Sequence, residues 1–505
     1  MTTVSRFRLC TILAAALTLQ AQDLKEFEKK VTEFTLPNGL HFIVAERHEA
    51  PVVSFHTYVN AGSVDDPSGE TGLAHMFEHM AFKGTDTIGT KDWASEKKAL
   101  DAIEEIYDRL EAERNRGPKA DEGNIGALEA KLNRAIEEAQ RFVEPNEYTR
   151  VIEESGGVGM NAGTALDSTE YYYSLPSNRI ELWFLLESQR FLHPVFREFY
   201  KERDVVMEER RMRVESSPQG KLQEDFLTTA FAAHPYHNPP GGWPSDIASL
   251  RSSQAKAFFD KYYVPSNVIM AIVGDVNPAD AKRMAERYFG PWQGRPQPPL
   301  VHTVEPPQPG PKTAIVESAS QPIELIGYKR PDQYDKDDAV FDVIQLVLSH
   351  GRTGLLYKEL VQDKKIALAA QVIGNFPGSR YPNLFTFVLV PSLGHTIEEN
   401  QKALEDLLSR FEAQPVDAAA LTRAKTQARA GVIRQLGNNS GLASLLTTYY
   451  AAYGDWRKLF TSLDELNKVT AADVQRVALR YFVTDSRTSA YTRQPAAAPA
   501  RGARQ

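Results

Sequence analysis

A proline-rich segment divides this chain into two parts of similar length. Between Tyr288 and Pro311, proline occurs at eight positions, a composition that favours extended polyproline II backbone over packed helices or strands. At 505 residues the chain is also longer than the roughly 250–300 residues at which single hydrophobic cores stop growing. We therefore expect a linker over residues 291–312, between an N-terminal domain of residues 22–290 and a C-terminal domain of residues 313–494.

The two parts carry similar patterns of elements. In the first part, an amphipathic stretch at Ala255–Tyr263 precedes a strand-like apolar stretch at Asn267–Gly274. In the second part, Ala471–Tyr481 precedes Thr488–Tyr491 in the same order. Such a weak repeat of about 200 residues indicates duplication of one domain. We predict an α+β fold made of two duplicated domains of similar topology, each a mostly antiparallel sheet packed with helices.

The N-terminal domain is expected to open with strands. Asn38-Gly39 lies between the alternating apolar runs Val31–Thr35 and Leu40–Val44, which is the strongest short-range signal for a β-hairpin. Pro51–Asn60 continues as an apolar-rich strand, and the apolar residues from Gly69 to Phe82 recur with helical spacing. That helix carries the most informative residues of the sequence.

Two stretches rich in Glu, Lys, Arg and Ala follow this helix. Trp93–Arg114 and Ile125–Arg141 have apolar residues three and four apart and are separated by Gly117-Pro118. They predict a charged helical insertion over about residues 93–148. A solvated spacer is favoured over a partner-binding surface, because charged helix faces usually contact only water.

The first residues have the layout of a secretory signal peptide. Arg6 and Arg8 precede an apolar run from Leu9 to Leu19 and the small residue Ala21. The run is shorter than the roughly 20 residues that a permanent membrane span requires. We therefore predict a signal peptide over residues 1–21 and export to the periplasm or the outside of the cell. An uncleaved N-terminal anchor is the alternative.

The composition excludes two broad classes of protein. A net charge of −8 provides no broad positive surface for nucleic acid. A mean hydropathy of −0.39 disfavours a membrane bundle. The last residues, 495–505, are rich in Ala, Pro and Arg, so we expect a disordered tail there.

The stretch His75-Met76-Phe77-Glu78-His79 predicts a metal site. Residues four apart on a helix share a face, so the imidazoles of His75 and His79 can reach one ion. Glu78 lies beside them and can act as general base toward a metal-activated water, as in the reversed His-x-x-Glu-His motif of inverzincins. Two imidazoles and a carboxylate favour one Zn²⁺ per chain with an open position for water. The alternative, two histidines four apart by chance, is uncommon for the five-residue pattern.

A third ligand must come from another segment. The stretch from Glu202 to Glu209 offers several carboxylates at helical spacing. Glu202 and Glu209 are seven residues apart, about two turns, and so share one face. Either could bind the metal while the other hydrogen-bonds a ligand. Spacing alone leaves this choice open.

Three separated motifs extend the case beyond one helix. They are Gly72–Thr85, Asn161–Thr164 with Tyr171, and Glu202–Glu209. In this order they resemble the pitrilysin/insulinase family of zinc metallopeptidases, which includes the mitochondrial processing peptidase β subunit and bacterial half-size homologues. The resemblance covers nearly the whole chain after the leader. It implies the LuxS/MPP-like metalloenzyme fold and an inactive C-terminal domain homologous to the N-terminal one.

The resemblance also implies roles for individual residues. It assigns Glu209 to the metal and Glu202 to a supporting position behind the ligands. It places Asn161 and Ala162 on an edge strand to which the substrate adds as a further strand. Phe82 matches an aromatic residue that lines the pocket beyond the scissile bond, with a place in the hydrophobic core as the alternative.

Three features depart from the family pattern. Glu209 follows His79 by 130 residues, against roughly 75 in the usual pattern, an excess about the size of the charged insertion. Gly163 replaces the usual aromatic residue, which predicts a wider and less selective pocket. The arginine and tyrosine of the family's second domain fall at Val361 and Leu368, whose side chains cannot donate hydrogen bonds.

Together these features predict a zinc endopeptidase that hydrolyses short or unfolded polypeptides. Because the Arg and Tyr are missing, we expect one half of a two-chain clamshell, completed by a second pitrilysin-like subunit or by another copy. One alternative is a non-catalytic peptide-binding or assembly subunit, which would need neither the metal ligands nor Glu78. A second alternative is hydrolysis of a small molecule, which the peptide-binding edge at Asn161 disfavours.

Overall fold

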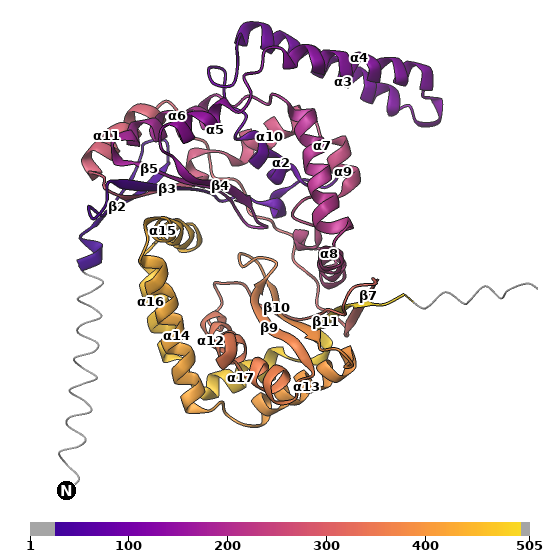
Figure 1. Ribbon diagram of the computed structural model, residues 1–505, viewed down its shortest axis with the longest axis vertical. Helices are drawn as coiled ribbons and strands as arrows, with labels where there is room; N and C mark the ends of the chain where they lie inside the picture. Colours follow the sequence, from indigo (N-terminus) through magenta and orange to yellow (C-terminus); the bar gives the residue numbers. More distant parts are fainter. Residues whose placement is uncertain (1–25, 496–505) are drawn as a thin grey trace, which may run out of the picture.

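The protein, seen in a computed structural model that describes residues 26–495, contains two sheets, each packed with helices (Figure 1). The predicted α+β class is therefore confirmed. The signal peptide predicted at residues 1–21, and residues 496–505 of the tail predicted at 495–505, lie outside the described residues. Within residues 26–495, no helix combines the length and the apolar character needed to cross a membrane.

The first sheet has six strands in the order β1-β2-β6-β3-β5-β4. Neighbouring strands run antiparallel, except that β2 and β6 are parallel. The predicted hairpin is confirmed as β1 and β2. Strand β4 lies at one edge, so Asn161 and Ala162 lie on an edge strand as predicted. The strands are β1 Val31–Thr35, β2 His41–Glu46, β3 Val52–Val59, β4 Val158–Thr164, β5 Thr169–Pro176 and β6 Val268–Gly274.

The second sheet repeats this topology. Its order is β7-β11-β8-β10-β9, with β7 and β11 parallel and the other neighbours antiparallel. The order and directions match β2-β6-β3-β5-β4 strand for strand, as expected for duplication. A helix follows the corresponding strand in each half, but α12 (Asp338–Ser349) contains no histidine, unlike α2 (Leu73–Met80). The strands are β7 Lys312–Glu317, β8 Glu324–Arg330, β9 Ala367–Phe376, β10 Asn383–Pro391 and β11 Arg487–Arg493.

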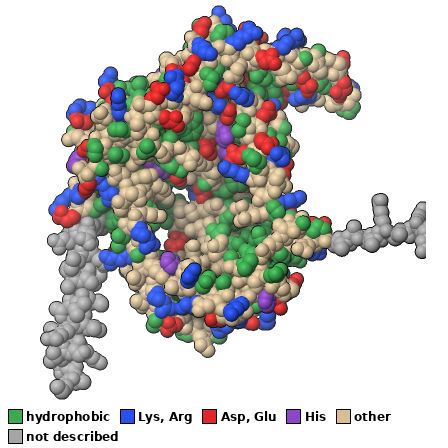
Figure 2. Space-filling model, viewed as in Figure 1, with side chains coloured by type: hydrophobic (Ala, Val, Ile, Leu, Met, Phe, Trp, Pro, Cys, Tyr) green, Lys and Arg blue, Asp and Glu red, His purple; other side chains and the backbone are tan. Residues whose placement is uncertain are grey.

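The charged insertion forms two long helices, α3 (Trp93–Arg114) and α4 (Glu122–Gln140), that project from the first half as a hairpin (Figure 1). Each helix begins at an aspartate, Asp92 or Asp121, whose carboxylate accepts hydrogen bonds from the first free backbone N–H groups. Charged side chains of both signs cover the hairpin on the face shown in Figure 2. The helical structure predicted for this segment is confirmed.

The two halves exchange helices. Helix α8 (Pro218–Ala230), from the first half, packs on β7 and β11 of the second sheet. Its Leu222 and Phe226 share a core cluster with Leu325 and Ala490. In return, α15 (Asn439–Tyr453), from the second half, packs on β3 and β6 of the first sheet. Each sheet is therefore covered in part by the other half of the chain.

The remaining helices complete the two layers around these sheets. No helix or strand lies between Phe289 and Lys312, where the proline-rich linker was predicted. In the first half, the remaining α-helices are α5 Glu147–Glu154, α6 Ile180–Leu192, α7 Phe199–Arg210, α9 Pro244–Ser249, α10 Ser252–Tyr262 and α11 Pro278–Phe289. In the second half they are α13 Ile397–Ala413, α14 Ala418–Leu436, α16 Lys458–Lys468 and α17 Ala471–Tyr481.

Candidate active site

Helix α2 is held firmly at its start. The carboxylate of Asp66 accepts hydrogen bonds from the backbone N–H groups of Gly72, at 2.7 Å, and Ala74, at 2.9 Å. Gly72 has a φ of 94°, and a Cβ there would lie 3.0 Å from the carbonyl oxygen of Gly241. The apolar face of the helix, which includes Phe77, is buried in the first core. The opposite face is thereby fixed toward α7.

The ligand atoms of His75, His79 and Glu209 converge. One ligand atom from each lies within 4.8 Å of the others. The Nε2 atom of His75 is 3.7 Å from Glu209 Oε1, and the Nε2 atom of His79 is 3.4 Å from Glu209 Oε2. Ligands about 2.0–2.1 Å from a tetrahedral zinc ion lie about 3.4 Å apart. The three side chains therefore fit a zinc ion without a large rearrangement.

Glu202 lies on the other side of the His79 ring. Its Oε2 is 3.4 Å from His79 Nδ1, and its Oε1 is 2.5 Å from Lys83 Nζ. Burial opposes ionisation of Glu202, but the contacts with His79 and Lys83 outweigh burial and lower its pKa. Spacing alone left open which glutamate faces the metal. In the structure, Glu209 faces the Nε2 atoms of His75 and His79, whereas Glu202 faces Nδ1 of His79.

The pKa of His75 suits a metal ligand. Burial, and then the neighbouring His79, lower it to about 4, so the imidazole is neutral at neutral pH. Its Nδ1 atom is buried without a hydrogen-bond partner among the described residues. Glu209 also forms an ion pair with Arg213, whose Nη1 lies 2.7 Å from Glu209 Oε1. This contact leaves Oε2 facing His79.

Glu78 points toward the edge strand. Its Oε2 accepts a hydrogen bond of 2.7 Å from the hydroxyl of Thr164, at the end of β4. Burial raises the pKa of Glu78, and the Thr164 hydrogen bond partly opposes that rise. A carboxylate with a raised pKa is a stronger base than an exposed glutamate. The geometry therefore suits proton transfer beside the converging ligands.

A cavity of about 280 Å³ adjoins the ligands. His75, Glu209 and Thr164 line it together with residues of α8 such as Gln223. The structure does not bring Phe82 into this cavity. Phe82 is partly buried against the first core, where its ring lies 5.2 Å from the guanidinium carbon of Arg190.

Three residues of this site, Lys83, Thr164 and Arg213, had no role predicted from the sequence. Lys83 and Thr164 lie inside the recognised motifs, but only the folded structure shows which carboxylates they contact. Arg213 has one local signal, its position four residues after Glu209, where a helix brings opposite charges together. The partners of Lys83 and Thr164 depend on contacts between segments far apart in the sequence.

The two positions that lack the expected Arg and Tyr lie just before strand β9 of the second half and at its start. Val361, in the π-helical segment Tyr357–Asp363, packs against the second core. Leu368, on β9, is 58% exposed. Neither side chain can donate a hydrogen bond to a substrate carbonyl.

Two family models match the sequence. Residues 42–105 and 135–241 match the model described as insulinase (peptidase family M16), and residues 249–428 match the peptidase M16 inactive domain. The first match is interrupted at residues 106–134, which lie in α3, α4 and the turn between them. The interruption agrees with an insertion at this place in the chain.

Similar proteins include several named as zinc proteases. The Helicobacter pylori zinc protease PqqE is 26% identical over 464 residues, which cover 90% of this chain and 91% of the relative. The Bacillus subtilis uncharacterized zinc protease YmxG is 20% identical, with 90% and 96% of the two chains covered.

Solved structures share the fold. The crystal structure of a protease from Helicobacter pylori has a TM-score of 0.76 at 26% identity and covers 92% of this chain and 99% of its own. The periplasmic protease PqqL from Escherichia coli has a TM-score of 0.69 at 15% identity. The match covers 93% of this chain but 49% of PqqL, and at this identity it shows the fold alone.

Proposed function

Because this chain belongs to the insulinase family of M16 peptidases, we propose that it is a zinc-dependent endopeptidase acting on short or unfolded polypeptides. The observation that carries the proposal is the convergence of His75, His79 and Glu209 within 4.8 Å, with Glu78 beside them. The relatives named zinc proteases support zinc as the metal.

His75, His79 and Glu209 would hold the ion, and Glu202 would fix the ring of His79. When bound, zinc supplies a Lewis acid toward water and the scissile carbonyl. Glu78 accepts the proton of the attacking water and later delivers it to the leaving amine. Thr164 orients the Glu78 carboxylate through its hydroxyl.

The edge strand β4 supplies the substrate surface in this proposal. An extended peptide can add to the free edge through backbone hydrogen bonds, with Asn161 and Ala162 in contact with it. Such recognition reads backbone more than side chains, and Gly163 adds no bulk to restrict the pocket. Flexible peptides of varied sequence are therefore the proposed substrates.

A second subunit would complete the site. Val361 and Leu368 stand where the family pattern has an arginine and a tyrosine that contact the substrate. Donors of this kind contribute on the order of 3 kcal/mol each in comparable oxyanion sites, so their loss needs compensation. We propose that a companion chain supplies them, as one half of a two-chain clamshell. If the signal peptide predicted at residues 1–21 is present, the two chains would assemble after export.

The alternative of a non-catalytic subunit has one observation in its favour. Residues 249–428 match the peptidase M16 inactive domain. That match falls mostly on the second half, whereas the four residues of the proposed centre lie at positions 75–209, in the part that matches the insulinase model. A binding subunit has no need of this complete set, so we favour the peptidase.

The test is Glu78→Gln, which keeps shape but removes the base. Zinc content would be measured by mass spectrometry and cleavage with quenched fluorescent unfolded peptides, with and without a companion chain carrying the Arg and Tyr. We expect zinc to remain and turnover to fall by about 10²–10⁴-fold. Glu208→Gln is the matched control, because its exposed side chain pairs with Arg211 outside the site. A wild-type protein that cleaves no peptide, even with the companion chain present, would favour the binding subunit, and equal cleavage by wild type and Glu78→Gln would exclude Glu78 as the base.

A further inference from the structure

The base of the charged insertion contacts a fully buried arginine, Arg197, two residues before α7 begins. The Nε atom of Arg197 lies 2.7 Å from Glu96 Oε1 on α3. Its other nitrogens donate to the carbonyl oxygens of Lys83 at 2.6 Å, Thr85 at 2.6 Å and Ile88 at 2.9 Å. These carbonyls belong to the loop that follows the metal-binding helix α2. One guanidinium therefore ties the insertion to that loop.

The loop is shaped to surround this guanidinium. Gly84 and Gly89 have φ values of +87° and +86°, which other residues rarely adopt. A Cβ on Gly89 would lie 2.7 Å from Arg197 Nη1, and one on Gly84 would lie 2.2 Å from the Ile88 carbonyl oxygen. Both positions therefore require glycine if the carbonyls are to reach Arg197.

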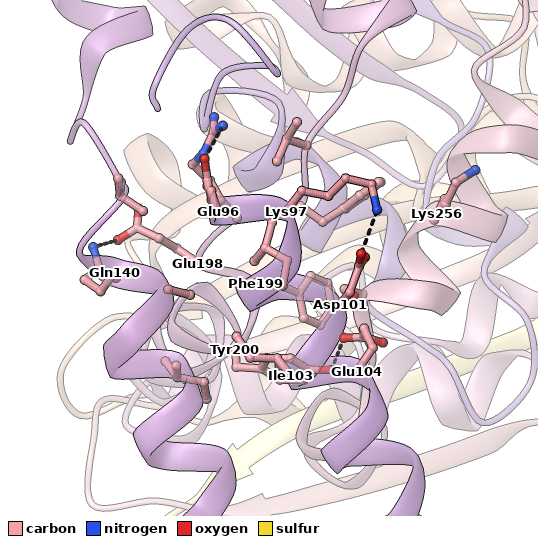
Figure 3. Close-up of a pocket in the computed structure, with 18 of the residues that line it drawn as sticks. Glu96, Lys97, Asp101, Ile103, Glu104, Gln140, Glu198, Phe199, Tyr200 and Lys256 are labelled. Carbon is pink, nitrogen blue, oxygen red and sulfur yellow. Dashed lines mark hydrogen bonds and ion pairs between the residues drawn. The ribbon is translucent and has the colours of Figure 1, made fainter. Parts of the chain in front are cut away.

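The next residue, Glu198, makes a second connection. It adopts a left-handed conformation with a φ of 58° immediately before α7. Its Oε1 accepts a hydrogen bond of 2.8 Å from Gln140, the last residue of α4, as the dashed line in Figure 3 shows. Its Oε2 lies 3.3 Å from Lys83 Nζ. Glu198 therefore joins the end of the insertion to Lys83.

From Lys83 the contacts reach the metal site. Lys83 Nζ is 2.5 Å from Glu202 Oε1, and Glu202 Oε2 is 3.4 Å from His79 Nδ1. The side chains of Lys83, Glu198 and Glu202 are 18%, 8% and 11% exposed, so solvent screens these charges little. An unbroken series of polar contacts thus connects α4 with a proposed zinc ligand.

A cavity of about 280 Å³ separates the insertion from α7 beside these contacts (Figure 3). Apolar residues of α3, Leu100 and Ile103, face Phe199 of α7 across it. The apolar packing of α3 against the first core is incomplete at this cavity, and the polar contacts at Arg197 and Glu198 lie beside the gap, where they help to position the base of the insertion.

We infer that the α3–α4 insertion is a positioning element for the zinc site, acting on His79 through Gln140, Glu198, Lys83 and Glu202. This inference rests on the proposed zinc function. Lys83 is shared between two carboxylates, those of Glu198 and Glu202. Glu198 Oε1 also pairs at 3.0 Å with Lys201, but that side chain is 60% exposed, so solvent weakens this pair. When Gln140 no longer satisfies Glu198, we expect Lys83 to move toward Glu198, so that Glu202 loses the cation that holds it behind His79.

The test compares variants of Gln140 in the full chain. Gln140→Glu keeps the size but places a second carboxylate against Glu198, whereas Gln140→Lys keeps a hydrogen donor. Zinc affinity would be measured by competition with a chromophoric chelator. We expect about tenfold weaker binding for Gln140→Glu, the range seen for groups behind metal ligands, and near wild-type binding for Gln140→Lys. Glu129→Gln is the control, because it breaks the exposed pair with Arg114 far along the hairpin.

A second readout does not depend on zinc. Hydrogen–deuterium exchange of the metal-free protein should rise over residues 81–90 in Gln140→Glu and stay unchanged in Glu129→Gln. Equal zinc affinity in wild type and Gln140→Glu would overturn the inference while leaving the peptidase proposal intact. Zinc binding that responds as expected, in a protein that cleaves no peptide, would overturn only the peptidase. A wild-type chain that binds no zinc would overturn both.

Discussion

The Thr164 hydroxyl donates a hydrogen bond of 2.7 Å to Glu78, which connects the edge strand to the metal-binding helix. Thr164 is the last residue of β4, the strand to which a peptide substrate would add. The same strand would therefore hold the substrate and aim the base. In the proposed function, one backbone segment would set both the position of the peptide and the orientation of the Glu78 carboxylate.

Thr164→Val tests this connection. The substitution keeps the branched shape and removes the hydroxyl, so Glu78 loses a hydrogen bond of the strength typical for charged groups. We expect kcat to fall about tenfold with little change in KM, because binding along β4 depends on backbone groups. Steady-state kinetics with a fluorescent peptide would measure both constants. Thr32→Val, on the exposed strand β1, is the matched control. An unchanged kcat would show that Thr164 does not orient the base.

Glu202→Gln should weaken zinc binding without unfolding the protein. The neutral amide of glutamine cannot form an ion pair with Lys83, so the side chain at position 202 is held less firmly against His79 Nδ1. Groups in this position typically contribute 10–100-fold in affinity, and we expect a loss of about that size. Chelator competition measures the affinity, and thermal unfolding of the metal-free protein checks the fold. If Glu202→Gln and Glu208→Gln bind zinc equally well, Glu202 has no supporting role.

Acid should destabilise the contact between the halves at His41. Burial lowers the pKa of His41 to about 4, and its ring stacks on Tyr450 of α15 at 3.7 Å. The unfolded chain binds the proton near the ordinary pKa of about 6.5, so stability is full above that pH and falls as pH drops toward 4. The loss from this residue is at most roughly 3 kcal/mol. Denaturant unfolding between pH 7 and pH 4 measures it.

His41→Phe keeps a ring at this contact but cannot take up a proton. We expect a smaller fall in the free energy of unfolding with acid than in wild type. Some dependence should remain, because burial also lowers the pKa of His234 to about 4. His395→Gln, at a solvent-exposed position on the second half, should behave like wild type. An unaltered slope in His41→Phe would assign the acid sensitivity to other groups.

Local signals predicted many of the elements. Asn38-Gly39 specified the first hairpin, because few residue pairs fit the turn that joins two twisted strands. The spacing of His75 and His79 predicted a shared helix face, and the structure places them so. The charge and periodicity of α3 and α4 predicted their helical structure. In each case the residues that determine the structure lie close together in the sequence.

Features that depend on distant contacts were not predictable from one sequence. Glu202 and Glu209 share a helix face, and only the packing of α7 against α2 shows which faces Nε2. Arg197 carries no local sign that it will be buried among carbonyl groups more than 100 residues away in the chain. The packing of α8 on the second sheet was also not predicted, because an amphipathic pattern does not specify which surface the helix packs against.

The crossing of α8 and α15 between the two sheets has a mechanical consequence. Opening one half away from the other would strip a buried helix from each sheet and expose apolar side chains such as Phe226 and Leu446 to water. We therefore expect the two halves of this chain to move as one body, so that in the proposed two-chain assembly a polypeptide would enter by separation of the chains.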